Sequence, residues 1–405
     1  MPQRKRHHEP VSLKMSARSR KELLEQARAR YRFRGKEGRS RLLDEICALC
    51  GYERKYVIKV LGGKRRLLAE NGLKRGGSAP RYGEAEREVL KAIWLYAEQP
   101  CGKRLEATVP IWLPHYEKRH GRLSALLRSN VLSISAATID RLLAPCRATL
   151  GSRGRCGTRP GTLLRSQIPV RTEHWDVSVP GYIEADTVAH SGESMAGEFC
   201  WTVTATDVHT QWTESRAVWN RSQPQVQQRI AQMEAALPFP ILGFDTDNGG
   251  EFINWHLFSY FHQRLKPVRF TRSRAYRKND NARVEQKNWT HVRQLIGYGR
   301  LEGEQVAELL NDLYAKEWSL FRNFFCPVMK HLRTEVEGSR KRRIYDRPAT
   351  PFERLKQSGK TDPAQLARLS KLLAQLDPFA LKHTIEGKLR AVLRHQVRPL
   401  RTRAA

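Results

Sequence analysis

The sequence predicts an α/β domain with a mixed sheet, preceded by helical modules and followed by a basic, mainly helical region. Between residues 175 and 300, β-rich and amphipathic segments follow in the order strand, strand, strand, helix, strand, helix, strand, helix. This order is typical of a sheet with helices on its faces. Outside that stretch, apolar residues recur mainly at helical spacing. The chain of 405 residues, 40% of them hydrophobic, is long enough for two or three domains.

The N-terminal region is predicted to bind DNA through a helix-turn-helix. Residues 1–20 are polar and basic and are expected to form an arm, and residues 21–63 are expected to form the helical module. Helical periodicity over Ser40–Cys50 ends at Gly51 and resumes over Glu53–Leu61. An ordinary helical hairpin is the alternative. The candidate DNA contacts are three basic residues of the second helix: Arg54, Lys55 and Lys59.

A second helical module is predicted over residues 83–146, between linkers at 64–82 and 147–174 that are rich in Gly together with charged residues or Pro. Ser135 is a suitable N-cap for the last helix of this module. That helix belongs either to a second helix-turn-helix or to a plain helical bundle. Its candidate DNA contacts are Thr138 and Arg141. The helices expected here cover 84–99, 103–118, 123–132 and 135–143.

The α/β domain is expected over residues 175–300, and the basic C-terminal region over 301–405. The β-rich segments are 182–186, 199–206, 211–218, 239–244 and 267–270. The helical segments of the domain are 224–236, 251–264 and 281–296. In the C-terminal region, the expected helical segments are 300–337, 362–376 and 378–395, with a basic loop at 338–343.

The charge of the chain indicates a polyanionic partner. Lys and Arg number 73 against 41 Asp and Glu, which gives a formal net charge of +32. Nucleic acid is the favoured partner, and an anionic membrane surface is the alternative. No apolar stretch approaches the ~20 residues of a membrane span, and the N-terminus lacks the apolar core of a signal peptide. We therefore expect a cytoplasmic protein with no membrane partner.

The seven Cys residues form an odd and scattered set, which does not predict a disulfide framework. Cys47 and Cys50 form a Cys-x-x-Cys pair, but no second pair follows at zinc-site spacing. Helix packing is therefore favoured over metal binding for these two side chains.

Three acidic residues have settings that point to phosphodiester chemistry. Asp186 ends an apolar run, Asp247 follows a strand candidate and precedes Asn-Gly, and Glu285 lies inside a predicted helix. Three carboxylates brought together can hold two divalent cations, the arrangement that activates an attacking oxygen and stabilises a leaving one. Two rival acids lie nearby, Asp207 and Asp245.

Two motifs carry a resemblance to a known family: Asp247-Asn248-Gly249-Gly250-Glu251-Phe252 and Asn279-Asp280-Asn281-Ala282-Arg283-Val284-Glu285. With Asp186 in Glu-Ala-Asp-Thr, they resemble the integrase core of DDE transposases, which include retroviral integrases and bacterial insertion-sequence transposases. The resemblance implies an RNase H-like fold, a five-stranded mixed sheet flanked by helices. It also implies that Asp186, Asp247 and Glu285 are catalytic and hold two Mg²⁺ or Mn²⁺ ions.

The resemblance further implies the activity and the partners. A member of this family binds the terminal inverted repeats of a mobile element, frees a 3′-hydroxyl at each end and joins it to target DNA. It acts as a homo-oligomer on paired ends, in the bacterial nucleoid. Two alternatives remain open. One is a catalytically inactive or domesticated DNA-binding protein, and the other is a nuclease of the same fold that cuts without joining.

Residues around the three acids have further candidate roles. Asn248 and Asn288 can orient carboxylates or contact DNA, and a turn residue and a surface amide are the alternatives. His190 lies four residues after Asp186, and a plain strand or loop histidine is favoured over a metal-site role. The candidate phosphate contacts, with a solvated charged face as the alternative, are Lys278, Arg283, Lys287 and Arg293.

Overall fold

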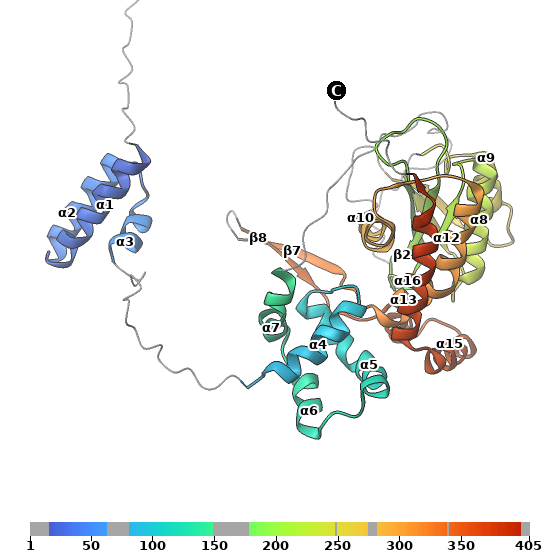
Figure 1. Ribbon diagram of the computed structural model, residues 1–405. Helices are drawn as coiled ribbons and strands as arrows, with labels where there is room; N and C mark the ends of the chain where they lie inside the picture. The colour runs from blue at the N-terminus through green and yellow to red at the C-terminus, as the bar shows by residue number, and fades with distance from the viewer. Residues whose placement is uncertain are drawn as a thin grey trace, which may run out of the picture. The chain divides into compact units, whose positions relative to one another are not determined.

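The computed structural model describes residues 16–62, 81–148, 178–247, 249–273, 282–337 and 340–397. The chain forms two compact units, Met1–Arg81 and Tyr82–Ala405, and both are drawn in Figure 1. The first unit is entirely helical where it is described, and the second contains the sheet.

Three helices make up the described part of the first unit: α1 (Ala17–Arg32), α2 (Lys36–Cys50) and α3 (Arg54–Leu61). Gly51 ends α2 with a φ of 67°, a left-handed conformation that glycine adopts without strain. Val57 and Leu61 of α3 are buried in a small core with apolar residues of α2. The predicted order of helix, glycine turn and helix is therefore confirmed.

The second unit begins with four helices, as predicted: α4 (Glu84–Tyr96), α5 (Gly102–His120), α6 (Ala125–Ser133) and α7 (Ala136–Ala148). The N-terminus of α5 lies directly against α7. The Gly102 N–H donates to Asp140 Oδ1 over 2.8 Å, and a Cβ at Gly102 would lie 2.3 Å from the Ala136 carbonyl oxygen. Only glycine allows this approach.

The sheet has five strands: β1 (Tyr182–Ala189), β2 (Trp201–Asp207), β3 (Thr213–Val218), β4 (Gly243–Thr246) and β5 (Arg269–Arg272). Their order is β3-β2-β1-β4-β5. β1 lies antiparallel to β2 and parallel to β4, and β4 is parallel to β5. The mixed five-stranded sheet that the sequence predicts is thus confirmed, with β1 in its centre.

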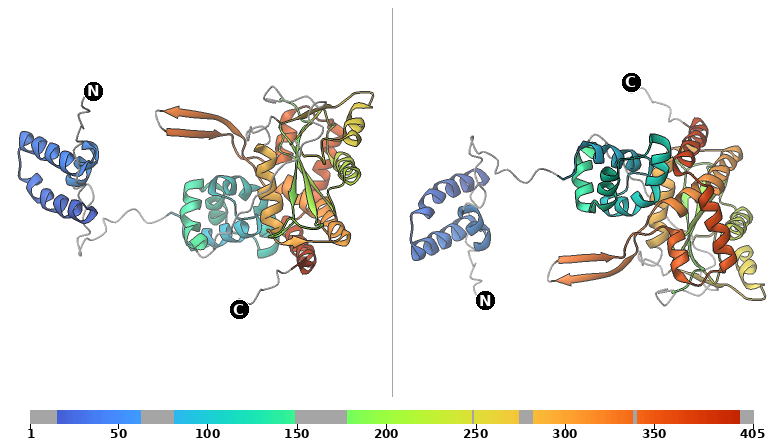
Figure 2. Two further views of the ribbon diagram at one scale, coloured as in Figure 1. Left: turned by 90° about the horizontal axis from the view of Figure 1, so that it is seen from above. Right: turned by 90° about the horizontal axis from the view of Figure 1, so that it is seen from below.

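Helices cover both faces of this sheet (Figures 1 and 2). On one side lie α8 (Gln223–Ala236) and α9 (Trp255–His262). On the other side a continuous helical segment runs through α10 (Ala282–Lys287), the π-helix η1 (Asn288–Arg293) and α11 (Gln294–Ile296). This segment packs on β1 and carries Glu285.

The free edge of β3 is closed by two asparagine side chains. They come from α12 (Glu304–Leu313) and from α13 (Ser319–Phe325), which follows the π-helix η2 (Tyr314–Trp318). The Asn311 amide bonds both the N–H and the C=O of Ala217, and the Asn323 amide does the same for Thr213, over 2.7–3.0 Å. The edge is therefore not available for pairing with another strand.

Two expectations for the C-terminal region are wrong. Residues 331–337 form the strand β7 (His331–Glu337) instead of a helix, and most of the basic run lies on the strand β8 (Arg340–Tyr345) instead of in a loop. The reason is the alternation of Leu332, Thr334 and Val336 with polar residues, which has the period of a strand. The two strands pair with each other as a ribbon that projects from the second unit (Figure 2).

The remaining described elements are three helices and a second short strand pair. The helices are α14 (Pro351–Ser358), α15 (Pro363–Gln375) and α16 (Pro378–Arg394), of which the last two were expected. The strands are β6 (Arg300–Leu301) and β9 (Gln396–Val397). No helix among the described residues is long and apolar enough to span a bilayer.

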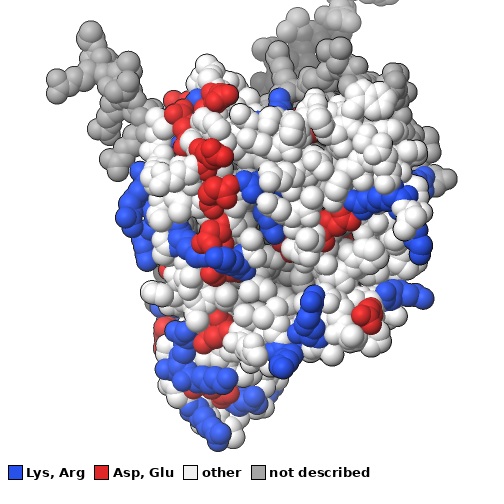
Figure 3. Space-filling model, turned by 90° about the vertical axis from the view of Figure 1, so that its right-hand side faces the viewer, with Lys and Arg blue, Asp and Glu red and all other residues white. Residues whose placement is uncertain are grey.

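The helical module of the second unit packs directly on the C-terminal helices. Trp112 of α5 donates from Nε1 to the Phe325 carbonyl oxygen over 3.0 Å, and Arg104 donates from Nε to Pro327 over 2.8 Å. One hydrophobic core runs through both parts. Figure 3 shows one face of the molecule, where a row of acidic side chains runs between groups of Lys and Arg. That face is therefore not a uniformly basic surface.

Candidate active site

The two aspartates occupy neighbouring parallel strands. Asp247 directly follows β4, as expected, but Asp186 lies in the middle of β1 and not at its end. The strand continues because Thr187 and Val188 are β-branched and pair with β2. Ala185 is opposite Thr246 in the parallel register, so Asp186 and Asp247 take the next positions on backbones about 5 Å apart.

Glu285 lies on α10, and three side chains of its helical segment attach that segment along β1. Arg283 pairs with Glu184 over 2.9 Å. Asn288 Nδ2 donates to Asp186 Oδ2 over 2.7 Å, and Arg293 Nη2 donates to the Ala189 carbonyl oxygen over 2.8 Å. The helix is therefore aligned with the strand that carries Asp186.

The environment of Asp186 is strongly unfavourable for a charge. Burial raises the pKa of this carboxyl well above its usual value, and the carboxylate of Asp247 raises it further, with smaller effects from Glu285 and Glu251. The Thr187 N–H, 2.7 Å from Oδ1, opposes this by stabilising the ionised form. Four acidic side chains therefore interact electrostatically at one place in the fold.

Asp247 has a similar environment. Burial raises its pKa to about 6, and the Glu251 carboxylate contributes in the same direction. The Gly249 N–H, which donates to Asp247 Oδ1 over 3.0 Å, and the Arg221 guanidinium both lower the pKa. A divalent cation would relieve this repulsion, because it stabilises ionised carboxylates.

Glu251 is the functional candidate that the sequence analysis did not single out. It is 4% exposed, accepts a hydrogen bond of 2.9 Å from Thr187 Oγ1 and pairs with Arg221 over 3.2 Å. Glu251 is part of the motif that begins at Asp247, and its position directly after Asp-Asn-Gly-Gly was the sequence signal that could have identified it. Only the fold shows that its carboxylate interacts with both aspartates.

The donor set suits a hard divalent cation, since every acidic ligand candidate is a carboxylate. Within the described part of the chain, no three His, Cys, Asp or Glu side chains are arranged as a complete metal site. The carboxylates interact electrostatically but are not arranged around one point, so binding a shared ion requires side-chain movement. Glu285 is exposed on α10.

The two rival acids have structural roles. Asp207 is fully buried and accepts hydrogen bonds from the backbone of Gly181 and from the backbone and hydroxyl of Thr210, over 2.6–2.8 Å. Asp245 is also fully buried and accepts a hydrogen bond from Thr271 Oγ1. Both carboxylates thus hold turns and strands together.

Two further candidate residues near the site, Lys287 and His190, are buried. Lys287 was a candidate phosphate contact, but only 2% of it is exposed, because it lies on the face of α10 that packs into the protein. His190 is fully buried, and burial lowers its pKa to about 3. Its Nε2 lies 2.8 Å from Thr202 Oγ1, which is the position of a strand histidine with a structural partner.

The other predicted DNA contacts have mixed surroundings. Lys55 and Lys59 are exposed on α3, whereas Arg54 pairs with Asp44 and donates to Ser40 of α2. Arg141 is exposed on α7 and donates to Thr138 Oγ1 over 2.8 Å. Two of the expected site residues lie outside the described part of the chain: Asn248 and Lys278.

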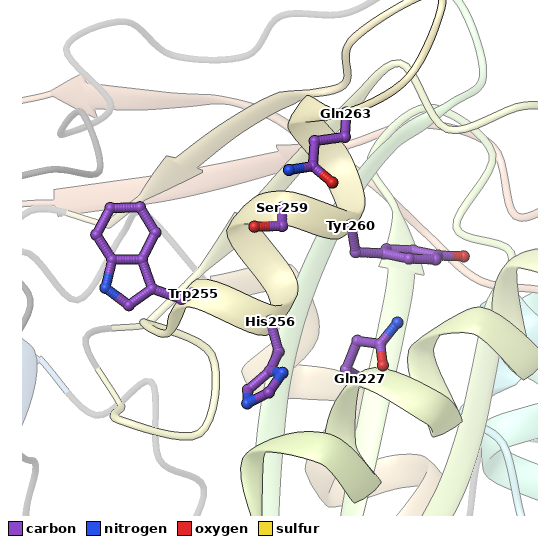
Figure 4. A pocket seen from close by; sticks show the side chains of 6 residues that line it. All are labelled: Gln227, Trp255, His256, Ser259, Tyr260 and Gln263. Atoms are coloured by element: carbon purple, nitrogen blue, oxygen red, sulfur yellow. The ribbon is translucent and has the colours of Figure 1, made fainter.

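An open pocket of about 500 Å³ lies between α8 and α9. Figure 4 shows its lining: Gln227 reaches it from α8, and the other side chains, Trp255, His256, Ser259, Tyr260 and Gln263, come from α9 and its C-terminal end. None of the four site acids lines this pocket. It is therefore separate from the carboxylates of the candidate active site.

No protein-family model matches the chain. Among solved structures, the HTLV-2 integrase catalytic core domain in complex with magnesium shares 12% identity, covers 37% of this chain and 91% of its own, and gives a TM-score of 0.27. A simian T-cell lymphotropic virus intasome bound to a PP2A regulatory subunit shares 12% identity over 53% of this chain and 69% of its own, with a TM-score of 0.29. Because both TM-scores are low, the fold class is assigned from the strand order β3-β2-β1-β4-β5 and not from these similarities.

A curated relative matches at much higher identity. It is the uncharacterized protein y4rM of Sinorhizobium fredii (strain NBRC 101917 / NGR234), which is 41% identical over 349 residues. The match covers 85% of this chain and 97% of the relative. The chain therefore belongs to the protein family of y4rM from Sinorhizobium fredii.

Proposed function

We propose that the chain is a DDE-type DNA transposase, which cuts the ends of a mobile element and joins them to target DNA. The observation that carries this proposal is the placement of three acids in chain order. Asp186 lies on the central strand, Asp247 follows the adjacent parallel strand, and Glu285 lies on the helix attached along β1. The motifs around them are those that resemble the DDE transposases.

The surroundings of the site residues indicate a role for each of them in this proposal. Asp186, Asp247 and Glu285 would hold the cations, and Asn288 would keep the Asp186 carboxylate in one orientation. Bound Mg²⁺ or Mn²⁺ would activate a water or a 3′-hydroxyl and stabilise the leaving oxyanion. The burial that raises both aspartate pKa values also excludes water, which strengthens every electrostatic interaction with a phosphate.

The remaining parts of the chain would bind DNA. Lys55 and Lys59 are exposed on α3, where they could contact DNA if this helix recognises the ends of the element. The net charge of +32 would add sequence-independent affinity through phosphate contacts, in the nucleoid of a bacterial cell. Pairing of two ends would need a homo-oligomer.

The test is a strand-transfer assay with labelled element-end DNA, a target plasmid and Mg²⁺ or Mn²⁺. We expect Asp186→Asn, Asp247→Asn and Glu285→Gln each to abolish cutting and joining while end binding persists. Asp312→Asn, at a partly exposed carboxylate paired with Lys316 and Lys388, is the matched control and should behave as wild type. Near-normal activity of any of the three variants would show that the acid concerned is wrongly assigned.

A second candidate is a DNA-binding protein without catalytic activity. It is favoured by one observation, namely that the described acids do not form a complete metal site as they stand. Band shifts with element ends, without cleavage in either metal, would support it. Cleavage without joining would instead indicate a nuclease of the same fold.

A further inference from the structure

Arg221 is an exposed cation that reaches a buried acid of the site. Its guanidinium stacks on the Trp201 ring at 4.3 Å, and its Nη1 lies 3.2 Å from Glu251 Oε1. The Arg221 side chain is 44% exposed and that of Glu251 is 2% exposed. Arg221 thus lies at the boundary between solvent and the carboxylates.

The two oxygens of Glu251 differ in their surroundings. Oε1 accepts from Thr187 Oγ1 over 2.9 Å and from Arg221, whereas Oε2 is buried and has no hydrogen-bond partner among the described residues. A buried carboxylate oxygen without a donor is costly. Gly249 makes room for this oxygen, because a Cβ there would lie 2.5 Å from Oε2. One oxygen of the Glu251 carboxylate is therefore satisfied, and the other is buried without a donor from the described part of the chain.

Glu251 also interacts with both site aspartates. Its carboxylate raises the pKa of Asp186 and that of Asp247, and Arg221 lowers that of Asp247. The guanidinium therefore compensates part of the negative charge of the site when no other cation is bound. A divalent cation at the same carboxylates would do this more strongly, because it carries two charges.

We propose that Glu251 is a fourth oxygen ligand of the divalent-cation site, and that Arg221 is its counter-ion until a cation binds. The free Oε2 is the donor atom that the ion would take. Arg221 would then leave Glu251 while staying stacked on Trp201, and its guanidinium would be available to a DNA phosphate. This inference rests on the proposed function, because it concerns the cation site of the same enzyme.

The alternative is that the Arg221–Glu251 pair only braces the segment after β4. Glu251 takes part in that segment through its carbonyl oxygen, which accepts from Asn254 Nδ2 over 2.6 Å. A brace and a counter-ion make opposite predictions for Arg221. Loss of a brace loosens the site and weakens cation binding, whereas loss of a competing cation strengthens it.

The experiment is Mn²⁺ binding to the full chain without DNA, measured by calorimetry and by the loss of the free Mn²⁺ EPR signal. We expect Glu251→Gln to weaken Mn²⁺ binding about 10-fold or more, and Arg221→Gln to strengthen it several-fold. Arg229→Gln and Glu308→Gln remove an Arg–Glu pair between α8 and α12 and should leave the affinity unchanged. Circular dichroism and thermal unfolding in EDTA verify that each variant is folded.

Three outcomes would overturn the inference: wild-type affinity in Glu251→Gln, weakened binding in Arg221→Gln, or no Mn²⁺ binding by the wild type. The proposed function is judged separately by strand transfer. Opposite shifts in Mn²⁺ affinity without any DNA cleavage would retain the inference and reject the transposase. Strand transfer that depends on Asp186, together with unchanged Mn²⁺ affinity in Glu251→Gln, would support the transposase and reject the inference about Glu251.

Discussion

The Asn288 amide donates a hydrogen bond of 2.7 Å to Asp186 Oδ2 and so connects the helical segment of Glu285 to the central strand. The carboxylate also accepts a hydrogen bond at Oδ1 from the Thr187 backbone N–H. Asp186 is thus held from the strand and from the helix at once. A fixed orientation matters because a cation ligand loses affinity when its supporting hydrogen bonds are removed.

Asn288→Ala should lower strand transfer about 10–100-fold without weakening DNA binding, since outer-shell partners of metal ligands have effects of this size. The assay is joining of labelled ends at several Mg²⁺ concentrations, and the loss should be smaller at high Mg²⁺. Thr290→Ala, two positions along the same π-helix, removes a hydroxyl that bonds Gln286 and His291 and is the control. Equal losses in both variants would argue against a specific role for Asn288.

Asp247→Asn should stabilise the metal-free protein at pH 8. The pKa of this carboxyl is about 6 in the folded chain against an ordinary 3.8, so the folded state binds more protons than the unfolded state between these values. Stability from this group is therefore present below pH 3.8, falls as the pH rises to 6 and stays low above it. The gain at pH 8 is at most about 3 kcal/mol.

Thermal unfolding of wild type and Asp247→Asn in EDTA, between pH 4 and pH 8, measures this difference. The advantage of the variant should shrink toward pH 4 and should be cancelled by saturating Mg²⁺ if the wild-type carboxylate is part of the proposed cation site. A gain that is constant across this pH range would show that charge repulsion is not its cause.

Lys287→Met should raise the stability of the protein, because the variant removes a buried amine that lies near other cations. Burial lowers the pKa of Lys287 well below its usual value, and the nearby cations Arg322, Arg104 and Arg354 lower it further. The unfolded chain thus binds the proton more tightly, so the wild type gains stability as the pH rises toward 10.

The measurement for Lys287→Met is chemical denaturation at pH 7 and at pH 10, with a larger gain expected at pH 7. DNA affinity should be unchanged, because the side chain does not reach solvent. A drop in DNA affinity with an unchanged salt dependence would indicate a disturbed helix, and a shallower salt dependence would restore Lys287 as a phosphate contact.

The ribbon of β7 and β8 should contribute to sequence-independent DNA binding. Arg342 and Arg343 are exposed on β8, and a two-stranded ribbon fits the major groove of duplex DNA. Arg342→Gln combined with Arg343→Gln should lower the slope of log affinity against log salt by up to about 2. Lys91→Gln with Lys316→Gln, at two exposed lysines elsewhere, is the control, and a slope equal to that of the wild type in the ribbon variant would exclude the contact.

Much of the fold follows from periodicity in the sequence. The helices of the first unit and the strands of the sheet were predictable because apolar residues recur at the spacing of each element. The ribbon was missed because Arg340 to Arg343 looks like a loop unless the alternation on the preceding segment is noticed. Similarly, β1 was expected to end at Asp186, since an acid after an apolar run usually marks a strand end.

A site residue could be predicted only where a distinctive local motif surrounds it in the sequence. Asp247 and Glu285 stand in distinctive motifs, whereas Glu251 becomes a candidate only when its carboxylate is seen beside Thr187 and Arg221. The cations that lower the pKa of buried Lys287 come from helices distant in the sequence, namely α5, α13 and α14. A lysine on a predicted amphipathic helix gives no indication of such distant contacts.

The π-helix after Glu285 accommodates an additional residue in this helical segment. Its hydrogen-bonded turns each contain one residue more than an α-turn, so the six residues of η1 turn the helix about as far as five α-helical residues would. Deleting one of the six would restore α-helical winding and leave the flanking turns nearly in register. Glu285 would then keep its side of the helix relative to β1. Homologues that are one residue shorter in this segment should therefore have a regular α-helix there.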